Sequence, residues 1–179
     1  MKLIVVTGMP GAGKSEVADT FRSADVPVIV MGDVIREEVR RRGLKPDPVN
    51  TKKVMLELRE ENGPGAVAMQ CIDDLKQTTA ELVVVEGCRS VAEIQVFDDY
   101  VEKVITICVH ASPATRFARL KARSRDDDPR EWSVFRERDI REISVGLGGV
   151  IALSDIMLVN EGTVDELHEI SQNVVKRFL

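Results

Sequence analysis

Short apolar runs alternate with amphipathic segments along most of the chain. The apolar runs have the length of strands, are rich in β-branched residues, and occupy residues 3–7, 26–31, 82–85, 104–109 and 155–159. Runs without polar alternation are typical of a parallel sheet that helices cover on both faces. We therefore predict an α/β fold, a doubly wound three-layer sandwich with a five-stranded parallel sheet.

Polar residues mark where three of the intervening helices begin. Ser112 stands directly before Pro113, so a capping side chain precedes a proline that suits the first helical position. Ser90 and Thr163 are each followed three residues later by a glutamate, which is the spacing of a capping box. We expect a helix to start at each of these places.

Three segments interrupt the regular alternation. Residues 45–48 and 62–65 contain prolines and glycines, and they bracket a pair of predicted helices between the second and third strands. Residues 123–132 form a charged insertion, which we interpret as a flap beside the sheet. The glycine cluster at 146–149 follows a helix rather than a strand, so we interpret it as a bend in the chain.

The composition is that of one ordinary globular domain. With 179 residues, 44% hydrophobic and 31% charged, the chain is expected to form a single domain over residues 1–179. A formal net charge of −5 argues against a nucleic-acid partner. Cys71, Cys88 and Cys108 are far apart and indicate neither a disulfide framework nor a zinc site. Lacking an 18-residue apolar run and a charged leader, the protein is expected to be cytoplasmic, with no membrane partner.

The strongest motif follows the first apolar run directly. It matches G-x-x-x-x-G-K-[ST], the Walker A pattern, and consists of Gly8, Met9, Pro10, Gly11, Ala12, Gly13, Lys14 and Ser15. A glycine-rich turn between a strand and a helix points backbone N–H groups into a concavity that binds phosphate oxygens. We predict that Lys14 reaches the β- and γ-phosphates of ATP and that Ser15 ligates Mg²⁺.

Charged residues follow the second and third predicted strands. Asp33 and Arg36 come after the second strand, and Glu86 and Arg89 come after the third. Ligands of open α/β sheets bind beyond the carboxyl ends of the strands, so these four residues should converge with the phosphate loop. Because a guanidinium group binds two oxygens together, we predict that Arg36 and Arg89 hold an anionic group of the acceptor. Each arginine taken alone is also compatible with a solvated side chain.

The two carboxylates leave several roles open. Asp33 either orients Arg36, takes a proton from an attacking hydroxyl group, or caps the helix that follows it. Glu86 is placed where it can order Mg²⁺, with water between them, or where it simply complements the dipole of the next helix. We assign Asp33 to the acceptor and to catalysis, and Glu86 to the metal.

Arginines are dense in the segment that follows the fourth strand. The positions of interest are Arg116, Arg119, Arg123, Arg136 and Arg138. The first three share one face at helical spacing, and ion pairs to the aspartates at 126–128 are the simplest explanation for any one of them. As a group they suit a lid that closes on ATP, supplies positive charge and excludes water.

The roles within this lid are assigned by position. Arg119 is predicted to bind the nucleotide. Arg123, Arg136 and Arg138 are predicted to face the transferring phosphoryl group and therefore to be catalytic.

Together these motifs resemble the nucleoside monophosphate kinase superfamily, and their order and spacing also resemble dephospho-CoA kinase. A largely archaeal family related to adenylate kinase is the closest overall match, and the resemblance extends through residues 154–161 near the end of the chain. It implies the strand order 2-3-1-4-5, an acceptor-binding helical region around residues 33–65 and a lid around residues 123–137.

One departure affects the identity of the acceptor. Adenylate kinases carry Asp-Gly-Phe-Pro-Arg where this chain has the shorter run Glu86, Gly87, Cys88 and Arg89. We expect Mg²⁺-dependent transfer of the γ-phosphoryl group of ATP to a small phosphate-bearing acceptor, as in a nucleoside monophosphate kinase. The alternatives are transfer to a sugar hydroxyl, as in dephospho-CoA kinase, and a nucleotide-binding switch that acts on a macromolecular partner.

Overall fold

Five parallel strands form the middle layer of the molecule, in the order β2-β3-β1-β4-β5. The computed structural model describes residues 1–125 and 128–179. The strands are β1 Lys2–Thr7, β2 Val28–Val30, β3 Leu82–Glu86, β4 Lys103–His110 and β5 Ile156–Val159. Their order and direction confirm the predicted α/β architecture and the predicted order 2-3-1-4-5.

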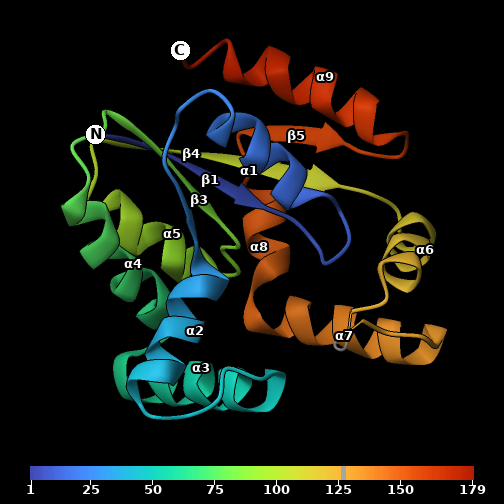
Figure 1. The fold of residues 1–179 in the computed structure, drawn as a ribbon, viewed down its shortest axis with the longest axis horizontal. Coiled ribbons are helices and arrows are strands. Elements are labelled where there is room, and N and C mark those ends of the chain that lie inside the picture. Colours follow the sequence, from blue (N-terminus) through green and yellow to red (C-terminus); the bar gives the residue numbers. More distant parts are fainter. Residues whose placement is uncertain (126–127) are drawn as a thin grey trace.

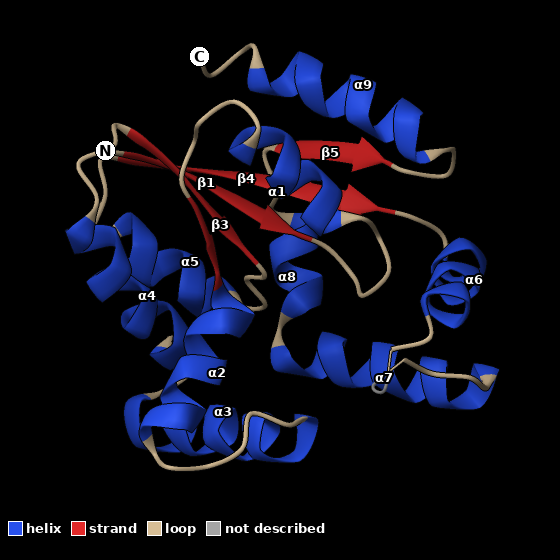
Figure 2. Cartoon of the chain, in the orientation of Figure 1, coloured by secondary structure: helices blue, strands red, loops and turns tan. Residues whose placement is uncertain are grey.

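Helices cover both faces of this sheet (Figure 1). They are α1 Lys14–Arg22, α2 Met31–Arg41, α3 Pro48–Asn62, α4 Ala66–Gln77, α5 Val91–Asp98, α6 Pro113–Arg123, α7 Trp132–Val145, α8 Leu147–Ala152 and α9 Val164–Val175. Figure 2 shows α1 and α9 on one face, α4, α5 and α8 on the other, and α6 and α7 beyond the ends of the strands. The predicted three layers are therefore present.

The central strand β1 supplies both hydrophobic cores through the alternation of its side chains. Leu3 and Val5 pack with residues of α2, α4 and α5, whereas Ile4 and Val6 pack with residues of α1 and α9. All four side chains are fully buried. This double burial explains why the strand reads as a continuous apolar run without polar alternation.

The second strand is shorter than the sequence predicts. It was expected over residues 26–31, but only Val28, Ile29 and Val30 pair with β3, and Met31 already begins α2. Val26 instead packs into the core under α1 and α9. Apolar character at both ends of the run reflects burial rather than strand pairing.

Two of the predicted helix starts form as expected, and one forms in part. Ser112 caps α6 ahead of its first-turn proline, and Thr163 forms a complete capping box at α9. Ser90 caps α5, but the carboxylate of Glu93 accepts from the backbone N–H of Arg89 and from Arg59 instead of closing the box. The predicted capping box at 90–93 is therefore wrong, because an ion pair to another helix takes its glutamate.

Two irregular segments are more helical than expected. Three helices (α2, α3 and α4), not two, lie between β2 and β3. Gly146 ends α7 at a φ of 118°, which confirms a bend there, but Gly148 and Gly149 lie inside the short helix α8. None of the described helices combines the length and the apolar character needed to cross a membrane.

Candidate functional site

The glycine-rich loop joins β1 to α1 in a conformation that side chains would obstruct. Gly8, Gly11 and Gly13 have φ values of 140°, 81° and 105°, a region that L-residues rarely adopt. A Cβ at Gly8 would lie 2.2 Å from the carbonyl oxygen of Val109, and one at Gly13 would lie 2.5 Å from Nδ2 of Asn160. The loop is therefore a close-packed turn at the start of a helix, as an anion-binding loop requires.

Lys14 folds back over this loop. Its ammonium group donates hydrogen bonds to the carbonyl oxygens of Gly8 at 2.9 Å and Met9 at 3.3 Å. Burial lowers the pKa of Lys14 to about 8, and the opposing charge of Glu86 limits the shift. An anion bound in the loop would stabilise the charged form of Lys14. A phosphate group would therefore raise the pKa of the lysine again.

Ser15 and Glu86 bring two oxygen atoms together beside the loop. The Ser15 hydroxyl donates to Oε1 of Glu86 over 3.2 Å, and the glutamate is buried at the carboxyl end of β3. Mg²⁺ prefers oxygen ligands of this kind and keeps several waters. No cluster of three or more metal-binding side chains occurs among the described residues, so the chain offers this pair and leaves the other positions to phosphate and water. The donor set fits Mg²⁺.

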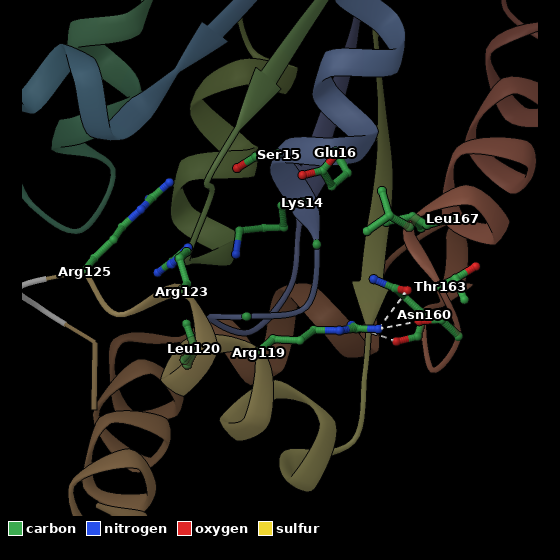
Figure 3. Close-up of a pocket in the computed structure, with 14 residues that line it drawn as sticks. Lys14, Ser15, Glu16, Arg119, Leu120, Arg123, Arg125, Asn160, Thr163 and Leu167 are labelled. Carbon is green, nitrogen blue, oxygen red and sulfur yellow. Dashed lines mark hydrogen bonds between the residues drawn. The ribbon is translucent and has the colours of Figure 1, made fainter. Parts of the chain in front are cut away.

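A cavity of about 400 Å³ opens beside the loop, and Lys14 and Ser15 are among the residues that line it. It is lined by the loop and α1, by arginines of α6 and the segment after it, and by the turn between β5 and α9 (Figure 3). Arg119 crosses this cavity and donates to the carbonyl oxygens of Asn160 and Gly162, both at 3.0 Å. Arg119 thus lines the same cavity as the phosphate loop, and its contact with a nucleotide stays a prediction.

Asn160 is a site residue that the sequence analysis missed. Its side chain donates to the carbonyl oxygen of Ala12 at 2.8 Å and accepts from Arg119 at 3.2 Å, and it is buried. It therefore connects the phosphate loop, α6 and the end of β5. Its position directly after a strand is the same signal that pointed to Asp33 and Glu86, and that signal would have found it.

Arg36 and Asp33 form a local pair on α2. The Arg36 Nε atom donates to Oδ1 of Asp33 over 3.0 Å, and both side chains are largely exposed. Helix α2 begins two residues earlier, with Val30 at its N-cap, so the capping interpretation of Asp33 is wrong. Of the roles left open, orientation of Arg36 agrees with this contact.

Arg89 lies between α3 and α7. Its Nε atom is 3.4 Å from a carboxylate oxygen of Glu142, and one of its terminal nitrogens is 3.8 Å from the sulfur of Met55. The charges of Arg89 and Arg138 lower the pKa of Lys14, while those of Glu86 and Glu142 raise it. These four charges therefore lie close enough to Lys14 to act on it.

Three of the arginines predicted for the lid lie near two buried aspartates. Asp128 accepts from Arg123 at 2.9 and 2.6 Å and lies 3.8 Å from Arg138. The Arg123 hydrogen bonds lower the pKa of Asp128. Arg136 lies 3.9 Å from Asp139, and only Arg123 of these three is among the described residues that line the cavity.

Contact with phosphate stays a prediction for all three of these arginines. The expected partners at 126 and 127 lie outside the described residues, as does that part of the predicted lid.

Trp132 packs against Phe117 and Phe135, with ring centroids at 5.3 and 5.2 Å, so it joins α6 to α7.

Solved structures with this fold include small-molecule kinases. TT1252 from Thermus thermophilus aligns with a TM-score of 0.71 at 19% identity, covering 99% of this chain and 97% of its own. Shikimate kinase from Bacteroides thetaiotaomicron aligns with a TM-score of 0.66 at 14% identity over 97% and 98%. A gluconokinase from Sinorhizobium meliloti aligns with a TM-score of 0.58 at 16% identity over 99% and 93%. The chain therefore has a kinase-like P-loop fold.

Sequence comparison gives the family. A family model described as an AAA domain matches residues 7–136. The UPF0200 protein of Hyperthermus butylicus is 44% identical over 175 residues, which cover 98% of this chain and 94% of the relative. The UPF0200 protein of Pyrococcus horikoshii is 43% identical over 181 residues, covering 99% and 97%. The chain thus belongs to the UPF0200 family of P-loop proteins.

Proposed function

We propose that this protein is a phosphotransferase that moves the γ-phosphoryl group of ATP to a small phosphate-bearing acceptor, in the manner of a nucleoside monophosphate kinase. The observation that carries the proposal is that Lys14 belongs both to the wall of a cavity and to a cluster of charged side chains outside that cavity. The cavity is lined by Arg119 as well as by Lys14, whereas Arg89, Arg138 and Glu142 do not line it but act on Lys14 through their charges.

The donor side suits a nucleoside triphosphate. The glycine loop would take the phosphates, and the adjoining cavity of about 400 Å³ has room for the ribose and the base. Ser15 and Glu86 would hold Mg²⁺, which supplies positive charge to the phosphate oxygens when bound. Lys14 would contribute a second charge near the transferring group.

The transfer itself needs positioning more than covalent chemistry. An acceptor phosphate oxygen attacks the γ-phosphorus, the bond to the bridging oxygen breaks, and ADP leaves with the electron pair of that bond. Such an oxygen is already anionic near neutral pH and needs no general base. Arg36 and Arg89 would align the acceptor, with Asp33 and Glu142 holding the two guanidinium groups in place.

One observation favours a hydroxyl-bearing acceptor as the second candidate. Each acceptor arginine already has a carboxylate partner, Asp33 for Arg36 and Glu142 for Arg89, so the acceptor side carries less net positive charge than two arginines suggest. The shikimate kinase and gluconokinase of similar fold are named for acceptors without phosphate. In that reaction Asp33 would take the hydroxyl proton.

A substrate screen tests the proposal. The purified protein is incubated with Mg·ATP and with nucleoside monophosphates or dephospho-CoA, and both acceptor phosphorylation and background hydrolysis are measured. Lys14→Ala should reduce transfer at least ~10²-fold with an unchanged circular dichroism spectrum. Hydrolysis that needs a macromolecular activator, with no acceptor phosphorylated, would support a nucleotide switch instead.

Asp33→Asn separates the two acceptor classes. For a monophosphate acceptor the change only loosens Arg36, and we expect about a tenfold loss, seen mainly in KM. For a hydroxyl acceptor it removes a general base, and kcat should fall by roughly 10² to 10⁴.

A further inference from the structure

A buried ion pair lies directly under the phosphate loop and has no part in the function proposed above. Arg116 on α6 donates to the two carboxylate oxygens of Asp139 on α7 at 2.8 and 2.6 Å. Both side chains are almost completely buried, at 3% and 4% exposure. A charged pair in such a place is costly unless its remaining donors are satisfied.

The remaining donors of Arg116 connect the pair to the loop. Its Nε atom donates to the carbonyl oxygen of Ala111, and Nη1 donates to the carbonyl oxygen of Pro10, both at 3.2 Å. The guanidinium group also lies 4.9 Å from the ring centroid of Phe135. One side chain thus touches α7, the end of β4 and the phosphate loop at the same time.

The contact with Pro10 constrains the peptide that follows it. In a planar trans peptide the carbonyl group and the next N–H point in opposite directions. Holding the Pro10 carbonyl on Arg116 therefore turns the N–H of Gly11 away from that guanidinium group, and Gly11 lines the cavity. Backbone N–H groups of such a loop are the donors that bind phosphate.

The loop also rests on the same part of α6. A Cβ at Gly11 would lie 3.0 Å from the Arg116 carbonyl oxygen and 3.0 Å from Cγ of Leu120. Because Asp139 fixes the guanidinium group, a movement of α7 changes the support of the loop. Helix α7 also carries Arg138, whose charge acts on Lys14.

We propose that Arg116, fixed by Asp139, is a positioning residue that holds the phosphate loop in its anion-binding geometry and couples it to α7. The proposal rests on the proposed function, since it requires the loop to bind a polyphosphate. The expected consequence is that phosphate affinity depends on this pair beyond any effect on stability.

The test compares variants of two buried ion pairs. Arg116→Met and the double variant Arg116→Met with Asp139→Leu remove the pair under the loop, and the double variant leaves no buried charge unpaired. Arg59→Met is the matched control, because Arg59 pairs with the buried Glu93 at 2.9 Å between α3 and α5, away from the loop. The affinities for Mg·ATP and for inorganic tripolyphosphate are measured by calorimetry, together with each melting temperature.

We expect both Arg116 variants to lose about tenfold or more in affinity for both ligands at temperatures where they are folded. Arg59→Met should lower the melting temperature but keep both affinities within about twofold. Arg116→Lys serves if the other variants do not fold, since it keeps the charge but lacks the planar fork that reaches Asp139 and Pro10 together. Unchanged affinity in the double variant or in Arg116→Lys would overturn the inference. Failure of the wild-type protein to bind either ligand would refute the proposed function instead.

Discussion

Lys14 is buried in a place where its positive charge is unfavourable unless an anion binds beside it. Its ammonium group donates to two backbone carbonyl oxygens, and burial lowers its pKa to about 8. A triphosphate would replace these neutral acceptors with charged oxygens and raise the pKa again. Binding of phosphate and protonation of Lys14 are therefore linked.

This linkage predicts a pH dependence of ATP affinity. Below pH 8 the free protein already carries the proton, whereas above pH 8 binding must take one up, so affinity should fall by up to about tenfold per pH unit. Phosphate groups ionise at about pH 6, outside this range. Calorimetric titration of Mg·ATP at several pH values between 7.5 and 9.5, in buffers of different ionisation enthalpy, measures both the affinity and the proton uptake.

Lys14→Met is the control for this effect. Its affinity should be weaker and should not change with pH in the same range. A wild-type affinity that stays constant across that range would contradict the assigned contact between Lys14 and phosphate.

The acceptor arginines give a second prediction at this scale. Arg36→Ala or Arg89→Ala should weaken acceptor binding by about 2 to 4 kcal/mol and leave ATP binding nearly unchanged, because a charged, two-pronged contact is lost on one side only. Arg40→Ala is the matched control, since Arg40 is on the same helix as Arg36 and pairs with Glu37 at 2.8 Å. Equal losses of affinity for ATP and for the acceptor would mean that these arginines contact the donor nucleotide instead.

At the scale of elements, α6 organises the site through three arginines of one face. Arg116 reaches the phosphate loop and α7, Arg119 reaches the turn after β5, and Arg123 reaches Asp128. The sequence predicted the shared face, because helical spacing is local. It did not predict the partners, because each lies in a segment whose position depends on the folded sheet.

The same distinction separates the correct predictions from the wrong ones. The five strands and the glycine loop were predicted because burial on both faces and phosphate binding each impose a local pattern. The strand predicted over residues 26–31 is too long, because Val26 is apolar for a core contact rather than for strand pairing. The predicted capping box at Glu93 is wrong, because the carboxylate of Glu93 pairs with Arg59. The local sequence pattern therefore predicts which helices and strands form, whereas contacts between distant residues determine where they begin and end.

Asn160 gives the prediction at the scale of elements. Asn160→Ala removes the buried hydrogen bond to the carbonyl oxygen of Ala12 and one of the three hydrogen bonds that Arg119 donates, at a cost of about 1 to 3 kcal/mol. The melting temperature and the ATP affinity should both fall. The control is Asn62→Ala, which removes a 3.4 Å bond to Leu58 on α3, away from the loop, and should leave ATP affinity unchanged. An unchanged ATP affinity in Asn160→Ala would mean that Asn160 does not support the phosphate loop.

For the molecule as a whole, the proposed transfer requires the cavity beside the phosphate loop and the acceptor arginines to be occupied at once. The donor cavity lies among α1, α6 and the turn before α9, whereas the acceptor arginines stand on α2 and ahead of α5. A ligand that joins two nucleosides through a chain of phosphates would span both sides. Linking the two halves converts the second contact into an intramolecular one and raises the overall affinity.

Thermal stability in the presence of such a ligand tests this arrangement. At one hundred times its dissociation constant a ligand stabilises the folded state by about 2.7 kcal/mol, which for a domain of this size is a shift of roughly 5 to 10 °C. At equal concentration, the adenosine dinucleotide with five bridging phosphates should raise the melting temperature more than Mg·ATP does. Arg36→Ala combined with Arg89→Ala should reduce that extra shift to the level of ATP, because only the donor half would remain bound. Equal shifts for the two ligands in the wild-type protein would mean that the acceptor side does not take a nucleoside phosphate, and the hydroxyl-bearing acceptor would then be preferred.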